Sequence, residues 1–373
     1  NMADTLGASP VVVDNGSGVI KSGLAGSDLP ESVLHNFVGR PKHERVMTGA
    51  IDEDILIGKR AEEMRGVLRL AHPMCNGVVQ DWEDMERVWS HLYMKELQVM
   101  PGDHPILITE SPLNPKRNRE RMAEILFDRF NVPALFVSNQ AVLCLYGSGR
   151  TTGIVLDCGD GVSSSVPIFE GFSLSHAISR MDYGGRDVTS YLRLLLRRSG
   201  YNFDTSAGME VVRKIKEGVC EVSQQAYGDV RSSITKPFVL PDGSILDAGA
   251  ERFQAPEVLF DPSLVGFESP GLHQALHSSI HKCDLDVRKT LLRQIVIAGG
   301  STLFSGFGER LLSEMRRLAG SGTKIRIAAP PERKYSAWIG GSILASLASF
   351  KSMWVSAEEW NEHGANILHK RMM

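Results

Sequence analysis

VVVDNGSGVIKSG (11–23) and IVLDCGDGVSSSV (154–166) share one pattern: an apolar run ends in an aspartate, and two glycines follow within four residues. Each stretch predicts a strand, a tight turn and a second strand, because glycine adopts positive φ and leaves backbone N–H groups unobstructed. Two matched hairpins far apart in the chain indicate an internal duplication that faces one ligand. A third turn, at Gly299 and Gly300, also follows an apolar run and is expected to precede a helix at 307–318.

The bulk composition is that of a globular protein with more than one core. The chain has 373 residues, of which 42% are hydrophobic and 23% charged, and its net charge is −3. This length predicts two domains, and the absence of a basic surplus argues against a general nucleic-acid-binding protein. The apolar run at 338–350 is too short to span a bilayer, and residues 1–10 lack the pattern of a signal peptide. Five scattered cysteines without a CxxC pair predict reduced thiols, which are typical of cytoplasmic proteins.

The segments between the hairpins alternate between two kinds of periodicity. Apolar residues at three- and four-residue spacing predict helices at 84–97, 118–130, 186–200 and 207–222, and short apolar runs predict strands at 105–109 and 134–138. Strands that alternate with helices indicate an α/β fold with partly parallel sheets.

The two hairpins predict a site for a polyphosphate and a cation. Glycine-rich turns offer backbone amides as preorganised donors, and Ser17 and Lys21 add a hydroxyl group and a positive charge. Asp14 and Asp157 would repel phosphates unless a cation lies between them, which indicates Mg²⁺ or Ca²⁺. The alternative is that both aspartates only cap their turns, since Asp-x-Gly is common in loops.

Long blocks of the sequence resemble the actin family. They include DNGSGVIKSGLAG (14–26), ILITESPLNPK (106–116), GRTTGIVLD (149–157) and APPERKYSAWIGGSILASL (329–347), and the resemblance covers nearly the whole chain. It implies an α/β, actin-like fold of two domains and four subdomains, with a nucleotide cleft and duplicated phosphate-binding hairpins. The implied small domain comprises 1–147 and 336–373, with an outer lobe at about 36–73, and the implied large domain comprises 148–335, with an outer lobe at about 185–273.

Other blocks look more like the centractin subfamily, the actin-related proteins of the dynactin filament, than like conventional actins. RVMTGAIDEDILIG (45–58), FNVPALF (130–136) and GSTLFSGFGERLLSEM (300–315) carry this similarity. It implies a cytoplasmic, cytoskeletal, ATP-binding protomer of a short filament that supports dynein-driven transport. The implied partners are further copies of the chain, dynactin-type subunits, dynein adaptors and capping proteins, without nucleic acid or membrane insertion. The 43–58 loop keeps the length of the actin loop that reaches the next subunit.

Two other functions stay open at this point. The first is a divergent conventional actin that forms dynamic filaments. The second is a small-molecule kinase or chaperone-type ATPase of the same fold, although the sequence offers no catalytic acid matched to a sugar.

The resemblance assigns the residues that would hold ATP or ADP. The phosphate-binding residues would be Gly16, Ser17, Gly18, Lys21, Gly159, Asp160, Gly161 and Val162. Asp14, Gln140 and Asp157 would hold Mg²⁺ or Ca²⁺, largely through water. The adenosine pocket would be formed by Arg213, Lys216, Glu217, Gly299, Gly300, Ser301, Phe304 and Lys334.

The chain departs from the family pattern where hydrolysis takes place. The family places a glutamine and a histidine near the attacking water; Gln140 is present, but the histidine position holds Ser164, which cannot act as a base near pH 7. A second family histidine is replaced by Asn76. The protein is therefore expected to be at most a slow ATPase coupled to polymerisation. His273, His277 and His281 recur every four residues, and we interpret this stripe as a solvated or interface face of a helix rather than a metal site.

Overall fold

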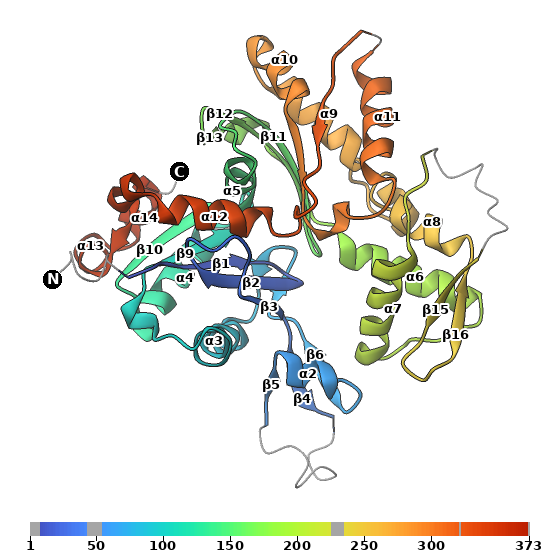
Figure 1. Ribbon diagram of the computed structural model, residues 1–373, viewed down its shortest axis with the longest axis horizontal. Coiled ribbons are helices and arrows are strands. Elements are labelled where there is room, and N and C mark those ends of the chain that lie inside the picture. The colour runs from blue at the N-terminus through green and yellow to red at the C-terminus, as the bar shows by residue number, and fades with distance from the viewer. Residues whose placement is uncertain (1–7, 43–53, 225–234, 321, 372–373) are drawn as a thin grey trace.

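A computed structural model describes residues 8–42, 54–224, 235–320 and 322–371, and it contains two central sheets (Figure 1). Most of the 43–58 loop, which was expected to reach a neighbouring subunit, lies outside the described residues.

The first central sheet, called the β1 sheet, has six strands in the order β19-β10-β9-β1-β2-β3. The strands are β1 (Val11–Asn15), β2 (Val19–Leu24), β3 (Ser32–His35), β9 (Ile106–Glu110), β10 (Ala134–Asn139) and β19 (Val355–Ser356). β1 pairs antiparallel with β2 and parallel with β9. All five residues of β1 are buried, which explains why this strand is a continuous apolar run before its aspartate.

The second central sheet, called the β11 sheet, repeats this topology. Its strands run in the order β13-β12-β11-β17-β18, and β14 also pairs with β12. They are β11 (Gly153–Cys158), β12 (Ser163–Phe169), β13 (Phe172–Ser173), β14 (Ser179–Met181), β17 (Ile295–Ala298) and β18 (Ile327–Ala328). As in the β1 sheet, a hairpin is followed outward by a parallel neighbour: β11 pairs antiparallel with β12 and parallel with β17. The predicted duplication and the α/β fold class are confirmed.

Two helices that pack against each other connect the sheets. They are α5 (Gln140–Gly147), which leads from β10 to β11, and α12 (Ser336–Ser346), which returns to the β1 sheet. A Cβ atom on Gly340 would overlap the carbonyl oxygen of Leu143, so the glycine allows the two backbones to touch. The indole N–H of Trp338 donates to the carbonyl oxygen of Val12 at 3.0 Å and anchors α12 on β1.

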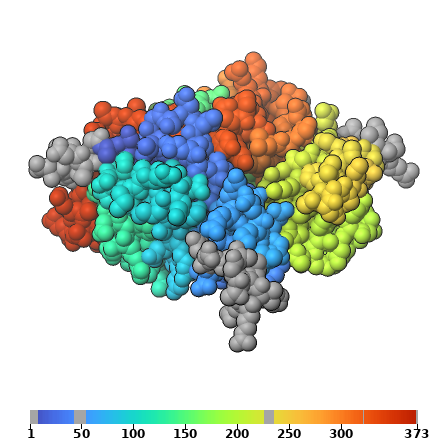
Figure 2. Space-filling view, turned by 60° about the horizontal axis from the view of Figure 1, so that its bottom comes forward, coloured from blue at the N-terminus to red at the C-terminus, as the bar shows by residue number. Residues whose placement is uncertain are grey.

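Each sheet carries an outer lobe. The β4–β6 lobe consists of β4 (Val38–Pro41), β5 (Leu56–Ile57), α2 (Lys59–Glu63) and β6 (Leu68–Ala71) around its own small core. The α6–α8 lobe consists of α6 (Gly185–Arg198), α7 (Ser206–Val219), β15 (Lys236–Val239), β16 (Ile245–Ala248) and α8 (Glu251–Glu257). Figure 2 shows the β4–β6 lobe in blue against the α6–α8 lobe in yellow-green on one face of the molecule.

The remaining elements cover the sheets. They are β7 (Met74–Cys75), β8 (Val78–Val79), α3 (Trp82–His91), α4 (Lys116–Glu124), α9 (Leu272–Lys282), α10 (Leu285–Arg293), α11 (Phe307–Ala319), α13 (Ala357–His363) and α14 (Ala365–Arg371). The helices predicted at 84–97 and 118–130 continue past α3 and α4 as π-helical turns, Leu92–Leu97 and Ile125–Arg129. No helix in the described part of the chain is long and apolar enough to cross a membrane.

Candidate functional site

A cavity of about 750 Å³ lies where the carboxyl ends of β1, β11 and β17 face the α6–α8 lobe. Every site residue predicted from the sequence except Ser164 lines it. These residues are Asp14, Gly16, Ser17, Gly18, Lys21, Gln140, Asp157, Gly159, Asp160, Gly161, Val162, Arg213, Lys216, Glu217, Gly299, Gly300, Ser301, Phe304 and Lys334. The fold thus brings both hairpins and the third glycine turn to one place, as expected for strands whose carboxyl ends share an edge.

Asp14 is the penultimate residue of β1, and its negative charge is compensated by partners within the protein. Its carboxylate accepts from Lys21 Nζ at 2.7 Å, from Thr109 Oγ1 at 2.9 Å and from Gln140 Nε2 at 2.8 Å. Burial alone would raise the pKa of Asp14, but Lys21 and these hydrogen bonds outweigh burial and hold it below the ordinary value. Asp14 is therefore a charged carboxylate with its partners already in place.

Asp157 is the penultimate residue of β11 and lacks such partners. None of the described residues donates a hydrogen bond to its carboxylate. Burial and the charge of Asp14 raise the pKa of Asp157 to about 6, against the opposing effect of Lys21. A group that is costly to ionise here would be stabilised by a divalent cation, which supplies positive charge beside both aspartates.

The two glycine turns meet in the cavity. A Cβ atom on Gly18 would lie 2.6 Å from Cβ of Asp160, and one on Gly161 would lie 3.3 Å from Cβ of Ser17. The amide N–H groups of Ser17, Gly18, Asp160 and Gly161 donate to no other described residue. Unused donors that converge from two turns fit an anion with several oxygens, such as a polyphosphate.

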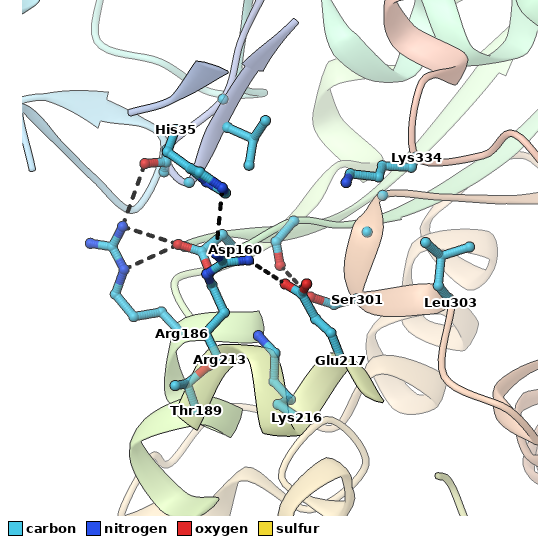
Figure 3. Close-up of a pocket in the computed structure, with 18 of the residues that line it drawn as sticks. His35, Asp160, Arg186, Thr189, Arg213, Lys216, Glu217, Ser301, Leu303 and Lys334 are labelled. Carbon is cyan, nitrogen blue, oxygen red and sulfur yellow. Dashed lines mark hydrogen bonds and ion pairs between the residues drawn. The ribbon is translucent and has the colours of Figure 1, made fainter. Parts of the chain in front are cut away.

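The opposite wall of the cavity combines buried charges with apolar surface (Figure 3). Lys216 on α7 is buried, which lowers its pKa, and its Nζ donates to the carbonyl oxygen of Gly185 at 2.9 Å. Arg213 donates to Glu217 at 2.9 Å. Across from α7, the hydroxyl group of Ser301 donates to the carbonyl oxygen of Gly159 at 2.8 Å. With Phe304 beside them, these side chains could bind a ring system and a sugar next to the phosphates.

Gly299 explains why the third turn requires glycine. Its φ is +89°, and a Cβ atom there would overlap the carbonyl oxygen of Cys158 and come within 2.5 Å of Asp157 Oδ1. This turn therefore lies directly against the acid of the second hairpin.

The two residues that replace family histidines lie in different surroundings. Ser164 is 2% exposed on β12, opposite Asp157 in the strand register, and it does not line the cavity. Asn76 has φ +47° and, with Gly77, forms the two-residue turn between β7 and β8. Asparagine and glycine suit this left-handed turn, so Asn76 has a structural role that histidine would fill less readily. A catalytic role for Ser164 and Gln140 stays a prediction.

Sequence reasoning missed several residues of the site, and three of them contact predicted site residues directly. Thr109 bonds Asp14 from the end of β9, Arg186 pairs with Asp160 at 3.0 Å, and His35 lies 3.4 Å from Arg213. The strand predicted at 105–109 was a usable signal for Thr109, because its carboxyl end is parallel to that of β1. Arg186 and His35 carried no local signal.

The histidine stripe forms no metal centre in the described part of the chain. His277 and His281 contact each other with ring centroids 4.2 Å apart, whereas His273 stacks on Phe260. No group of three potential ligands occurs among the described residues. All five cysteines are free thiols, and only Cys75 is exposed.

Comparisons with known proteins extend over the whole chain. The family model described as Actin matches residues 5–373. A protein named "Actin-like protein" from Neurospora crassa is 52% identical over 379 residues, which cover 99% of this chain and 100% of that relative. The similarity includes both central sheets, both outer lobes and every segment that lines the cavity.

Proposed function

The chain belongs to the actin family, and from this premise we propose that it is an ATP-binding, filament-forming protomer of the centractin type. In this proposal it builds a short cytoplasmic filament of the dynactin kind, which supports dynein-driven transport. Its partners are further copies of itself, dynactin-type subunits, dynein adaptors and capping proteins. Self-assembly into filaments is general in the family, whereas the centractin assignment rests on the sequence blocks described above.

The observation that carries nucleotide binding is the pair of glycine turns with unused amides beside an uncompensated Asp157. Gly16, Ser17 and Gly18 of the first turn and Gly159, Asp160, Gly161 and Val162 of the second would surround the phosphates, with Lys21 nearby. Asp157, together with Asp14 and Gln140, would hold Mg²⁺ or Ca²⁺ through its water shell. The cation would supply charge neutralisation between carboxylates and phosphates.

The adenosine half of the nucleotide would lie against α7 and the third turn. Arg213, Lys216 and Glu217 come from one side, and Gly299, Gly300, Ser301, Phe304 and Lys334 come from the other. A ligand that contacts both sides of the cavity stabilises the closed arrangement by mass action, so ATP or ADP would serve chiefly as a clamp and an assembly signal.

Hydrolysis in this proposal is slow or impaired. The position of the family histidine holds a serine that is buried beside the cavity, and the side chain of Gln140 is engaged with Asp14. Phosphate release should be measured at a polymerising concentration for the wild type and for Ser164→His. We expect the histidine variant to release phosphate faster; equal rates would contradict impaired hydrolysis.

Electron microscopy of the purified protein with Mg²⁺ and ATP tests the assembly. The proposal predicts filaments of short, limited length that sediment only partly. Long filaments that grow and shorten would favour a divergent conventional actin instead. A protein that stays monomeric and transfers phosphate to a small metabolite would favour a kinase of the same fold.

A further inference from the structure

A single threonine contacts both the carboxylate and the backbone of the first hairpin. Thr109 belongs to β9 and is 1% exposed. Its Oγ1 atom accepts a hydrogen bond from the backbone N–H of Asn15 at 3.0 Å and donates one to Asp14 Oδ1 at 2.9 Å. Because an N–H group can only donate, the proton of the hydroxyl group is left for the carboxylate. The directions of both hydrogen bonds are therefore fixed.

The parallel pairing of β9 with β1 brings Thr109 to this position. The strand register pairs the residue before Thr109 with the residue before Asp14. The same arrangement in the β11 sheet pairs Asp157 with Ala298 of β17. Since alanine has no hydroxyl group, the second hairpin has no equivalent of the two threonine contacts. The paired strand thus contributes a donor to one aspartate and none to the other.

Thr109 contacts the cavity only through its neighbours. Asp14 and Asn15 line the cavity, whereas Thr109 does not. In the proposed function these two neighbours serve different parts of the ligand. Asp14 would hold the cation, and Asn15 directly precedes the glycine turn that would bind the phosphates. An effect of Thr109 on a ligand must therefore pass through both of them.

Other side chains hold either the carboxylate or the turn of this hairpin. Lys21 Nζ and Gln140 Nε2 donate to the carboxylate of Asp14 at 2.7 and 2.8 Å. Asn36 Nδ2 donates to the carbonyl oxygen of Gly16 in the turn at 2.9 Å. The threonine hydroxyl group joins the two parts in one chain of hydrogen bonds, from amide to hydroxyl to carboxylate, and such chains strengthen each member.

We propose that Thr109 is a positioning residue of the nucleotide site, which fixes the first phosphate turn and the carboxylate of Asp14 relative to each other and thereby strengthens the binding of a nucleotide together with its divalent cation. This inference rests on the proposed nucleotide function of the cavity. Groups that are already in place need less ordering when the ligand binds. Loss of the hydroxyl group should weaken binding of the Mg²⁺–ATP complex more than binding of ATP alone, because only the complex uses both parts.

Three substitutions test this coupling. Thr109→Val keeps nearly the same shape without the hydroxyl group, whereas Thr109→Ser keeps the hydroxyl group without the methyl group. Thr152→Val is a matched control, because the Thr152 hydroxyl group also accepts a backbone N–H, that of Glu170 at 3.0 Å, and Thr152 does not line the cavity. If Thr109→Val lacks the circular dichroism of the folded wild type, Thr109→Cys takes its place, since a thiol is a weak donor and acceptor.

The first measurement is the dissociation constant of a fluorescent ATP analogue for the full chain, kept below the polymerising concentration, with Mg²⁺ and with a chelator. From the strength of hydrogen bonds to charged groups, we expect Thr109→Val to weaken binding about tenfold with Mg²⁺ and less than about threefold with the chelator. Thr109→Ser and Thr152→Val should bind as the wild type does. Unchanged binding by Thr109→Val, an equal loss in both conditions, or no rescue by serine would overturn the proposal.

A second measurement separates the positioning role from the proposed function. Hydrogen exchange of the Asn15 amide without ligand reports whether its hydrogen bond to Thr109 is present. We expect faster exchange in Thr109→Val and wild-type exchange in Thr109→Ser and in the control. If the wild type binds no nucleotide while this pattern holds, the proposed function fails and Thr109 stands as a contact that fixes the turn. If the exchange of Asn15 does not respond to Thr109→Val, the positioning role fails whatever the cavity binds.

Discussion

Asp14 of the β1–β2 hairpin lies opposite Lys21 in the strand register, whereas Asp157 of the β11–β12 hairpin lies opposite Ser164. The two hairpins have the same glycine spacing and the same place in their sheets. Cross-strand partners share a face of the sheet, so the residue opposite each aspartate helps to set its environment. Lys21 and hydrogen bonds hold the pKa of Asp14 down against burial, whereas burial and the charge of Asp14 raise the pKa of Asp157 to about 6.

The two repeats therefore differ in whether the charge of their aspartate is compensated within the protein. In the first hairpin, the carboxylate of Asp14 already has the Lys21 ammonium group and two further hydrogen-bond donors as partners. In the second hairpin, the carboxylate of Asp157 would gain such a partner only from a bound cation. The duplicated backbone therefore provides one preassembled anchor and one position that favours cation binding.

Removal of Lys21 should cause the largest loss of folding stability, because it breaks the buried Asp14–Lys21 ion pair of the first hairpin. Lys21→Met leaves the Asp14 carboxylate buried without its cation, and the loss of one partner of a buried pair costs about 3–5 kcal/mol. We expect a lower midpoint of urea unfolding, followed by circular dichroism in the presence of a chelator. The double variant Asp14→Asn, Lys21→Met should recover much of the loss. A single variant as stable as the wild type would show that Asp14 does not depend on Lys21.

Neutralisation of the aspartate in the second hairpin should instead stabilise the protein. The pKa of Asp157 is raised from 3.8 to about 6 in the folded protein, so folding stability due to this group is lost as pH rises through about 4 to 6. One pKa unit corresponds to about 1.4 kcal/mol. Asp157→Asn should therefore stabilise the chelator-treated protein at pH 7 by an amount of the order of 3 kcal/mol.

Two comparisons test whether the stabilisation by Asp157→Asn comes from the removal of a buried charge. The stability difference between Asp157→Asn and the wild type should shrink on going from pH 7 to pH 4.5, because the wild-type carboxyl group is then largely protonated. With Mg²⁺ and ATP the order should reverse, since the variant lacks the carboxylate that meets the cation. A variant that is less stable than the wild type under chelator would mean that Asp157 is not a strained group.

The repeated pattern was predictable from the sequence because it is local. An apolar run, an aspartate and two glycines determine a strand end and a tight turn, and the two copies predicted an internal duplication, which the equivalent strand orders of the two sheets confirm. The same local pattern predicted the third turn at Gly299 and Gly300, whereas the place of these glycines in the site was implied by the resemblance to actins. The helices predicted at 84–97, 118–130, 186–200 and 207–222 correspond to α3, α4, α6 and α7, although the first two end in π-helical turns.

The electrostatic difference between the hairpins was not predictable in this way. It depends on strand register and on Thr109 and Gln140, which come from other strands and helices. Ser164 was expected near the attacking water, yet it is buried off the cavity, because its exposure depends on what packs over β12. His35 and Arg186 reach the site through the arrangement of the lobes, for which no local pattern exists.

The equivalent glycines Gly18 and Gly161 differ in how much space surrounds them. Alanine at Gly18 would place its Cβ 2.6 Å from the side chain of Asp160, whereas alanine at Gly161 would meet its nearest neighbour, the amide nitrogen of Asn76, at 3.2 Å. Overpacking typically costs about 1–3 kcal/mol. We expect Gly18→Ala to fall within this range and Gly161→Ala to cost less, measured by thermal unfolding without nucleotide. Equal losses would mean that the turns do not approach as closely as described.

The β7–β8 turn gives the smallest expected effect, because it touches both hairpins only at its tip. The amide of Gly77 donates to Ser17 Oγ at 2.8 Å on the first hairpin, and the backbone of Asn76 lies against Gly161 on the second. Asn76 has φ +47°, where asparagine and glycine are tolerated and other residues lose about 1 kcal/mol or more. Asn76→Ala should therefore lower the unfolding free energy by about 1 kcal/mol, whereas Asn76→Gly should differ little from the wild type. Both variants keep the Gly77 amide, so a loss in alanine alone assigns the cost to backbone conformation. Equal losses in the two variants would instead assign a role to the asparagine side chain, which could then contribute to the site in place of the family histidine.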